Sequence, residues 1–339
     1  MTKIAINGFG RIGKLVVRRL FDQGLGSKIK LINDPNGSVK NIANSIEFDS
    51  VHGGWIKPIT IKNKEIIIDG SQINIVQYCT IPELKNDISE IDLVIDCTGV
   101  NRNFKLLNEY LQFGVRTVLV SAPIKDDRIL NIVYGVNHQL YDQAQNKIIT
   151  AASCTTNCLA PIVKVLHENI GIKHGSITTI HNLTNSQTIL DKPSKNLRRD
   201  RAALNSLIPS TTGSATAISL IFPNLEGKLN GHAVRVPVMN ASLIDCVFEV
   251  ETKVNRSYIN ELFRSASKTE LRGILGVEER ELVSADFCNN PLSTIIDAPS
   301  TLVVNGTQLK IYAWYDNEWS YACRMVDIVA KTQENYAKR

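Results

Sequence analysis

A cysteine and a histidine, two residue types that support nucleophilic catalysis, lie in segments that suit such chemistry. Cys154 lies in the segment Ala-Ala-Ser-Cys-Thr-Thr-Asn-Cys, between an expected strand and an expected helix. The dipole at a helix N-terminus favours a thiolate. His181 ends an alternating, strand-like run and is the candidate general base. Sequence spacing cannot establish a contact in space, so a buried structural thiol and a solvated histidine stay open as the alternative.

Groups that suit an anion follow the histidine. The stretch 195–201 (Lys-Asn-Leu-Arg-Arg-Asp-Arg) is basic, residues 209–213 read Pro-Ser-Thr-Thr-Gly, and Arg235 comes later. Guanidinium groups, hydroxyls and free backbone N–H groups make good phosphate sites. A solvated charged surface explains the run at 195–201 equally well.

A glycine-rich motif begins the chain. Asn-Gly-Phe-Gly-Arg-Ile-Gly at 7–13 contains G-x-G-x-x-G between an expected strand and an expected helix. Gly8 allows the tight turn, Gly10 lets the backbone approach a pyrophosphate, and Gly13 permits close helix packing. Asp34, at the end of the second strand, is placed to bind an adenosine ribose and to repel a 2′-phosphate. The motif predicts a dinucleotide site that prefers NAD to NADP.

The composition excludes several classes of protein. The 339 residues are 43 % hydrophobic and carry a net charge of +5. This mild charge fits a small anionic ligand better than nucleic acid, and we expect no membrane span and no signal peptide. The seven cysteines are scattered without metal-binding spacing, so we expect no metal site and a reducing, cytoplasmic location.

The elements that position these groups change character along the chain. Short apolar runs alternate with helical segments up to about residue 170, which predicts a parallel sheet covered on both faces. Longer, more alternating runs follow, which predicts a mostly antiparallel sheet. The expected fold is therefore an α/β Rossmann-type domain followed by an α+β catalytic domain. The polar stretch 182–208 is long for a loop and is expected to be functional.

The motifs together resemble phosphorylating glyceraldehyde-3-phosphate dehydrogenase. They are NGFGRIG, SCTTNCLAP, H-x-x-TN-x-Q, LRR-x-RA, P-x-TTG, RVP and WYDNEW, in family order over nearly the whole chain. The resemblance implies an NAD-binding domain over 1–152, a catalytic domain over 153–317, and a C-terminal helix over 318–339 that returns to the first domain.

The resemblance also implies roles for individual residues. It makes Cys154 the nucleophile and His181 the base. The residues implied to hold substrate and inorganic phosphate are Ser153, Thr155, Thr184, Arg199, Thr212, Gly213 and Arg235. The residues implied to contact NAD, besides the three glycines, are Arg11, Ile12, Asp34, Ser121 and Asn317, of which Asn317 reaches the nicotinamide amide. The implied assembly is a homotetramer whose loop at 182–208 reaches a neighbour's cofactor site.

The implied reaction joins oxidation to phosphorylation. Cys154 adds to the aldehyde of glyceraldehyde 3-phosphate, hydride leaves to NAD while His181 takes the hydroxyl proton, and phosphate attacks the resulting thioester. The product is 1,3-bisphosphoglycerate. Some segments depart from the common family pattern, among them Asn-Leu-Thr-Asn-Ser at 182–186 and His-Ala-Val at 232–234, and an arginine expected near adenine is absent from 77–79.

Three alternatives stay open. Segments such as LNSLIPSTTGSAT and GHAVRVP resemble a branch associated with arsenic resistance, in which arsenate replaces phosphate and gives 1-arseno-3-phosphoglycerate. A sister enzyme, erythrose-4-phosphate dehydrogenase, releases the acid by hydrolysis. An NAD-binding regulator without turnover is the third, and the presence of both Cys154 and His181 argues against it.

Overall fold

The computed structural model describes residues 2–194 and 196–337, so Lys195 of the basic stretch and the outermost ends of the expected domains lie outside it. The chain forms two compact units. Unit 1 is made of Met1–Ser153 and Tyr321–Arg339, and unit 2 of Cys154–Ser320. No helix in the described residues is long and apolar enough to cross a membrane.

The strands of unit 1 form one sheet in the order β3-β4-β5-β2-β1-β6-β7-β9-β8. They are β1 (Ile4–Asn7), β2 (Ile29–Asn33), β3 (Ile59–Lys62), β4 (Glu65–Ile68), β5 (Ser71–Val76), β6 (Leu93–Asp96), β7 (Thr117–Val120), β8 (Leu130–Asn131) and β9 (Ile148–Thr150). Pairing is parallel except where β4 meets β3 and β5. Every residue of β1, β6 and β7 is buried, so helices or loops cover both faces of the central sheet.

Helices lie between the strands of unit 1 in the sequence, and a further helix belongs mainly to its second segment. They are α1 (Arg11–Asp22), α2 (Val39–Glu47), α3 (Lys85–Ile88), α4 (Phe104–Gln112) and α8 (Trp319–Ala337), whose first two residues belong to unit 2. Leu107 and Tyr110 of α4 share one apolar cluster with Ala5 of β1. Alternate residues of a strand point to opposite faces, so the neighbours of Ala5 in β1 are buried on the other face of the sheet.

The strands of unit 2 form a second sheet in the order β11-β12-β10-β13-β17-β15-β14, with β16 paired to β17. They are β10 (Ile172–His181), β11 (Ile208–Thr211), β12 (Leu229–Arg235), β13 (Ser242–Val250), β14 (Leu275–Glu278), β15 (Thr294–Asp297), β16 (Leu302–Val304) and β17 (Gln308–Tyr315). Most pairs are antiparallel, but β10 runs parallel to β12 and β14 to β15. The predicted fold class, one mostly parallel and one mostly antiparallel sheet, is confirmed.

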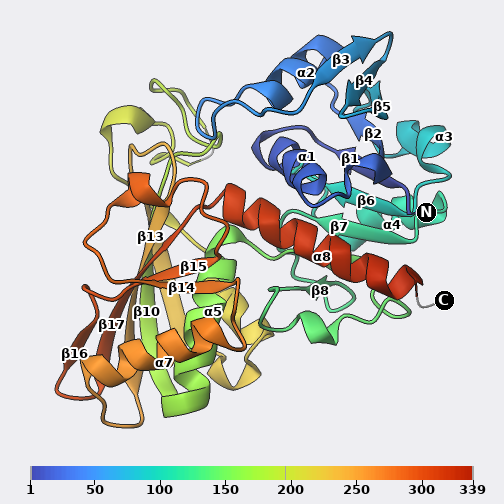
Figure 1. Ribbon diagram of the computed structural model, residues 1–339. Helices are drawn as coiled ribbons and strands as arrows, with labels where there is room; N and C mark the ends of the chain where they lie inside the picture. The colour runs from blue at the N-terminus through green and yellow to red at the C-terminus, as the bar shows by residue number, and fades with distance from the viewer. Residues whose placement is uncertain (1, 195, 338–339) are drawn as a thin grey trace. The chain divides into compact units, whose positions relative to one another are not determined.

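Helices cover this second sheet. They are α5 (Cys154–Ile170), α6 (Ser214–Ala217) and α7 (Arg256–Lys268). Figure 1 shows α5 lying along the sheet, where it contacts β10, β13, β15 and β17. Strand β13 alternates strictly between buried and half-buried residues, the pattern of a sheet with one face in the core.

Short 3₁₀ helices connect several of these elements in both units. They are Gly26–Lys28, Pro82–Leu84, His138–Leu140, Ala203–Asn205, Ile218–Leu220, Pro223–Leu225 and Ser284–Phe287.

Candidate active site

The thiol of Cys154 lies at the start of a helix, as the sequence predicts. Strand β9 ends at Thr150, and Cys154 is the first residue of α5. Between them Ala152 adopts a φ of 51°, a left-handed conformation that costs about 1 kcal/mol or more for a residue with a Cβ. Its N–H donates to the Thr150 hydroxyl at 3.0 Å, and its carbonyl accepts from the Tyr321 hydroxyl at 3.0 Å. These bonds hold the sharp turn that presents Cys154.

The histidine comes to the thiol from the neighbouring sheet. His181 is the last residue of β10, and its Nε2 lies 3.8 Å from the Sγ of Cys154. Only 5 % of His181 is exposed, and its ring meets the ring of Tyr315 edge-on at 6.2 Å. The Tyr315 hydroxyl also lies 2.7 Å from the Thr179 hydroxyl and 3.0 Å from that of Thr155. These hydroxyl contacts connect α5, β10 and β17 near the Cys154–His181 pair.

Two guanidinium groups complete the cluster. Nη1 of Arg235 lies 2.5 Å from Nδ1 of His181 and 3.4 Å from the carbonyl oxygen of Asn182. Nη1 of Arg199 lies 3.4 Å from the hydroxyl oxygen of Ser186. Neither arginine has a carboxylate partner among the described residues, and the Nε of each is buried without a hydrogen-bond partner. Half-buried positive charge that no carboxylate of the described residues compensates is the electrostatic character of an anion site.

Burial dominates the titration of this cluster. It raises the pKa of the Cys154 thiol, and the positive charge of Arg235 and hydrogen bonds from Thr155 only partly oppose this. The pKa of His181 is lowered to about 3, first by burial and then by the charge of Arg235, so the imidazole is neutral at ordinary pH. Burial also lowers the pKa of Arg235, although it stays a cation.

The remaining residues expected to hold substrate lie at different distances from this cluster. The Thr184 hydroxyl is 2.9 Å from that of Ser186, which links Thr184 to Arg199. Thr212 accepts a hydrogen bond from the Ser214 N–H, and it and Gly213 come directly before α6, which contacts α5. In the described residues, Thr212 and Gly213 make no hydrogen bond to the cluster. Ser153 is half-buried in the turn before Cys154.

A hydrogen bond holds the side chain of Asn317, two residues after the end of β17. Its Oδ1 accepts a hydrogen bond from the Ser242 hydroxyl at 3.1 Å, and only 5 % of the residue is exposed. Ser242 in turn accepts from the N–H of Asn182, the residue after His181. The structure thus connects Asn317 to the strand that carries His181.

The glycine-rich turn of unit 1 lies where the order of the parallel strands reverses. From β1 the chain continues to β2 on one side and later to β6 on the other, and ligands of such sheets bind at this point, beyond the carboxyl ends of the strands. Gly8 has a φ of 91°, and a Cβ there would lie 2.6 Å from the N of Thr98. A Cβ on Gly13 would lie 2.1 Å from the carbonyl oxygen of Gly8. A Cβ on Gly10, by contrast, would have no neighbouring atom within 4 Å.

These features fit a bound dinucleotide. Gly10 is the N-cap of α1 and offers no side-chain cap, and the space beside its Cα is open, as the approach of a pyrophosphate to the start of the helix requires. The Asp34 carboxylate accepts hydrogen bonds from the N–H of Phe9 at 2.8 Å and of Asn36 at 2.9 Å. A carboxylate accepts about four hydrogen bonds, so two positions stay available for a ribose diol.

The side chain of Arg11 is already paired. Its guanidinium donates two hydrogen bonds to Asp49, a buried carboxylate that Lys14 also contacts. Burial would raise the pKa of Asp49, but the hydrogen bonds from Arg11 and Lys14 outweigh it and lower that pKa. The backbone of Arg11 is therefore the part that can serve a cofactor. Ser121 is half-buried at the end of β7, and its N–H donates to the Asp96 carbonyl at 2.9 Å.

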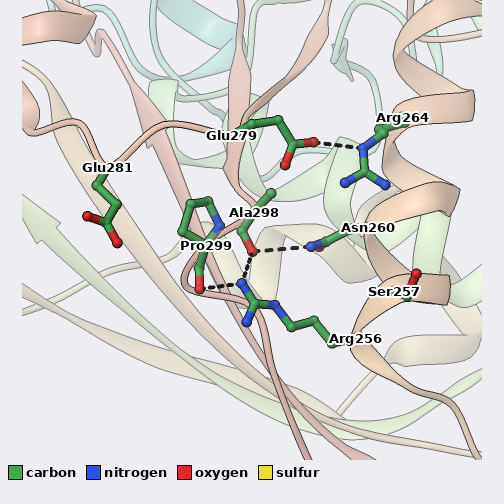
Figure 2. Close-up of a pocket in the computed structure, with 8 residues that line it drawn as sticks. All are labelled: Arg256, Ser257, Asn260, Arg264, Glu279, Glu281, Ala298 and Pro299. Atoms are coloured by element: carbon green, nitrogen blue, oxygen red, sulfur yellow. Dashed lines mark hydrogen bonds and ion pairs between the residues drawn. The ribbon is translucent and has the colours of Figure 1, made fainter.

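An open pocket of about 660 Å³ elsewhere in unit 2 is a weaker candidate site (Figure 2). Arg264 there is paired with Glu279 at 2.7 Å, and Arg256 donates to the carbonyls of Ala298 and Pro299. Asn260 also donates to the Ala298 carbonyl. Both arginines of this pocket thus have partners that occupy their donors, and two carboxylates, Glu279 and Glu281, line it, so the pocket offers less to an anion.

Sequence reasoning missed Tyr315, Thr179, Ser242 and Asp49. Thr179 precedes His181 by two residues and so shares its strand face, a signal that could have been used. Tyr315 stands inside the motif WYDNEW without a role of its own. Its three hydroxyl and ring contacts come from distant parts of the chain.

Comparison with known proteins identifies the family of the chain. Residues 2–103 match the family model described as "Glyceraldehyde 3-phosphate dehydrogenase, NAD binding domain", and residues 153–317 match that of the C-terminal domain. The predicted cofactor, NAD, is therefore confirmed at the level of the family.

Relatives match over almost the full length. "Glyceraldehyde-3-phosphate dehydrogenase 3" of Nostoc sp. is 51 % identical over 330 residues, which cover 97 % of each chain. "Glyceraldehyde-3-phosphate dehydrogenase 1" of Bacillus cereus is 42 % identical over 97 % of this chain and 98 % of its own. The protein named "Glyceraldehyde-3-phosphate dehydrogenase" in Geobacillus stearothermophilus is 42 % identical over 97 % of each. The resemblance found in the sequence is thus confirmed, and the chain belongs to the glyceraldehyde-3-phosphate dehydrogenase family of NAD-dependent oxidoreductases.

Proposed function

We propose that this protein oxidises D-glyceraldehyde 3-phosphate with NAD and transfers the acyl group from Cys154 to inorganic phosphate, which gives 1,3-bisphosphoglycerate. The observation that carries the proposal is the distance of 3.8 Å from Cys154 Sγ to His181 Nε2, in a cluster with two arginines that have no carboxylate partner among the described residues. A nucleophile, a base and an anion site are thus present together in unit 2. Family membership and the names of the relatives support the same substrate.

The residues divide the chemistry among them. Arg235 and Arg199, with Thr184, hold the phosphate of the aldehyde, while Ser153, Thr155, Thr212 and Gly213 are proposed to hold the attacking oxyanion. The Sγ of Cys154 adds to the aldehyde carbon, and Nε2 of His181 accepts the hydroxyl proton. NAD, when bound, supplies the hydride acceptor. His181 and Thr155, which are buried, limit the access of water to the thioester on the half-buried Cys154, so that the oxyanion takes the acyl group.

The cofactor is proposed to bind through the turn at Gly8, Gly10 and Gly13, with Asp34 on the ribose. The backbone N–H groups of Arg11 and Ile12 face the pyrophosphate, Ser121 lines the ribose side, and Asn317 orients the nicotinamide amide. In this assignment residues 1–152 form the NAD-binding domain, 153–317 the catalytic domain, and 318–339 return to the first.

Arsenate is proposed as a second acceptor, which gives 1-arseno-3-phosphoglycerate. It has nearly the same tetrahedral shape and charge as phosphate, and guanidinium and N–H donors recognise both alike. The segments LNSLIPSTTGSAT and GHAVRVP resemble the branch associated with arsenic resistance, and this resemblance favours arsenate as an acceptor.

A homotetramer in a reducing cytoplasm is the proposed state of the protein. All seven cysteines are free, as a reducing compartment requires. Large apolar side chains of the loop at 182–208 are exposed, and a second copy of the chain would cover them. They are Ile189, Leu190, Leu197, Leu204 and Leu207.

The test is NADH formation from glyceraldehyde 3-phosphate with phosphate, with arsenate and with neither. We expect turnover that needs an oxyanion and is lost in Cys154→Ser, while Cys158→Ala, one helical turn further on, keeps it. A much higher kcat/KM with arsenate favours the arsenate role. Turnover without any oxyanion, best with erythrose 4-phosphate, favours the hydrolytic sister enzyme. NAD binding with no thiol-dependent turnover of either aldehyde contradicts the proposal and leaves the regulator.

A further inference from the structure

Four buried polar side chains lie together where the central parallel strands of unit 1 end. Asn7, Asn33 and Asp96 are the last residues of β1, β2 and β6, and Asn7 is the register partner of the other two. Register partners of parallel strands point to the same face of the sheet. Tyr110 of α4 reaches this face, and each of the four residues is at most 6 % exposed. Polar groups buried this deeply are costly unless they are hydrogen-bonded.

The four side chains form one chain of hydrogen bonds, and a backbone group fixes its direction. The N–H of Tyr78, which can only donate, bonds to Oδ1 of Asn33 at 2.8 Å. Nδ2 of Asn33 must then donate, and it bonds to Oδ1 of Asn7 at 2.7 Å and to the Tyr78 carbonyl at 3.0 Å. Nδ2 of Asn7 donates in turn to the hydroxyl oxygen of Tyr110. The Tyr110 hydroxyl therefore donates its own hydrogen to Oδ2 of Asp96, at 2.9 Å.

Asp96 is the acceptor at which the chain of hydrogen bonds ends. Its Oδ1 accepts from the N–H of Thr98 at 3.0 Å and from the Thr98 hydroxyl at 2.7 Å, and its Oδ2 also accepts from Nδ2 of Asn101 at 2.8 Å. With the Tyr110 hydroxyl, these donors fill the roughly four acceptor positions of a carboxylate. Burial raises the pKa of Asp96, and the hydrogen bonds offset part of that rise. The same side chain thus holds the turn after β6 and the hydroxyl of α4.

The chain of hydrogen bonds links three segments of the proposed cofactor site. Asn33 directly precedes Asp34, the proposed ribose ligand, and Asn7 directly precedes the glycine-rich turn. At the other end, the turn after β6 packs on the glycine-rich turn, where a Cβ on Gly8 would lie 2.6 Å from the N of Thr98. Buried hydrogen bonds that share donors and acceptors in this way respond together. A change at one end therefore reaches all three segments.

We propose that Tyr110 and Asp96 are positioning residues for the dinucleotide, which act through Asn7 and Asn33 to hold the three segments as one unit. Their effect reaches the segment at Tyr78, although Asp96 lies two strands away from β2 in the sheet. The inference rests on the proposed cofactor site. It does not rest on the proposed reaction, because it concerns binding alone.

Two substitutions break the chain of hydrogen bonds with little change of volume. In Asp96→Asn one carboxylate oxygen becomes an NH2 group, so a donor faces the donors around it. In Tyr110→Phe the amide of Asn7 loses its acceptor and no longer fixes Asn33. The N–H of Tyr78 is then held less firmly in both variants, because its acceptor on Asn33 is free to turn.

The test makes two measurements on the full-length protein and these variants. Calorimetric titration gives the affinity for NAD, and hydrogen–deuterium exchange with mass spectrometry gives the protection of the segment that contains Tyr78. We expect Asp96→Asn and Tyr110→Phe each to bind NAD about tenfold more weakly, the scale of one lost buried hydrogen bond, and to exchange faster at Tyr78 without any ligand.

The double variant and a control separate this role from general destabilisation. Asp96→Asn with Tyr110→Phe should lose no more NAD affinity than the weaker-binding single variant, because both changes break one chain of hydrogen bonds. Independent effects would multiply to about a hundredfold loss. Leu107→Ala removes an apolar side chain from the same helix and the same apolar cluster. It should lower stability but keep the NAD affinity and the Tyr78 exchange of the wild type.

Unchanged NAD affinity in Tyr110→Phe overturns the proposal, and so does weaker binding without faster exchange at Tyr78. A double variant whose loss is the product of the two single losses also overturns it. Tyr110→Phe decides the matter where Asp96→Asn fails to fold. A wild-type protein that binds no NAD would reject the proposed cofactor site and this inference with it, whereas NAD binding without NADH formation would reject the proposed reaction alone.

Discussion

Opposing influences act on the pKa of the Cys154 thiol. Its place at the start of α5 predicts a favoured thiolate, yet burial raises the pKa of the thiol above its ordinary value. The helix terminus and Arg235 reduce this penalty without removing it.

The first prediction concerns the pH dependence of this thiol. Without added ligand, alkylation of Cys154 by iodoacetamide should rise with pH along a single inflection above the ordinary thiol value of about 8.5. His181 should add no inflection near pH 6.5, because its pKa of about 3 leaves it neutral there. Arg235→Gln should move the inflection upward, because the positive charge that favours the thiolate is gone. Mass spectrometry of the peptide that contains Cys154 gives the rates, and an inflection between about pH 6 and 7 would contradict the prediction.

The second prediction concerns the choice of cofactor. Asp34→Ala removes the carboxylate that favours a ribose diol and repels a 2′-phosphate. NAD affinity should fall by about tenfold, equivalent to one charge-assisted hydrogen bond of about 1.4 kcal/mol, while NADP affinity should rise. Calorimetric titration with both cofactors measures this. An equal loss for NAD and NADP would instead mean that Asp34 acts by holding Phe9 and Asn36.

At the scale of the element, the turn between β1 and α1 shows how two glycines of one motif do different work. A Cβ on Gly13 would overlap the carbonyl oxygen of Gly8, whereas a Cβ on Gly10 would meet no protein atom. Gly13 therefore serves the packing of the helix, and Gly10 leaves room for a ligand that approaches the helix from outside.

The third prediction separates these roles. Alanine usually stabilises a helix interior, but in Gly13→Ala the overlap should dominate and lower the free energy of unfolding by about 2 to 3 kcal/mol. Gly10→Ala should change it by less than about 1 kcal/mol and still weaken NAD binding. Thermal unfolding and calorimetric NAD titration test the pair. If the Gly10→Ala protein binds NAD as tightly as the wild type, Gly10 is not part of the cofactor site.

The sequence predicted the regular elements better than their contacts. Continuous or alternating apolar residues predict strands over 29–33 and 308–315, and β2 and β17 have these bounds in the structure. The strands β3, β4 and β5 were missed because they are short and partly exposed. The bond of Tyr315 to Thr155 and the contact of Arg235 with His181 depend on strand register, which no local pattern specifies.

At the scale of the whole molecule, the exposed apolar residues of the loop at 182–208 need an explanation. Ile189, Leu190 and Leu197 are each more than two-thirds exposed, which is unfavourable unless another surface covers them. The proposed tetramer supplies such a surface.

The fourth prediction tests this assembly. The double variant Leu190→Ser, Leu197→Ser should lower the molar mass measured by light scattering, because it removes apolar area from the contact between copies. Leu140→Ser, which changes an exposed leucine outside the loop, should keep the mass of the wild type. An unchanged mass in the double variant would mean that this part of the loop lies outside the contact.

The division of unit 1 into two chain segments has a consequence during synthesis. Met1–Ser153 leaves the ribosome first, but α8, which buries Tyr321, Met325 and Val329, belongs to the last segment. At about 5–20 residues per second, the intervening unit 2 takes roughly 10–30 s to translate. Unit 2 can therefore fold as a continuous piece while the nascent unit 1 still lacks its final helix. Chaperones that bind nascent chains would therefore bind the apolar surface of unit 1 that α8 has yet to cover. Once the finished chain is released, α8 covers this surface.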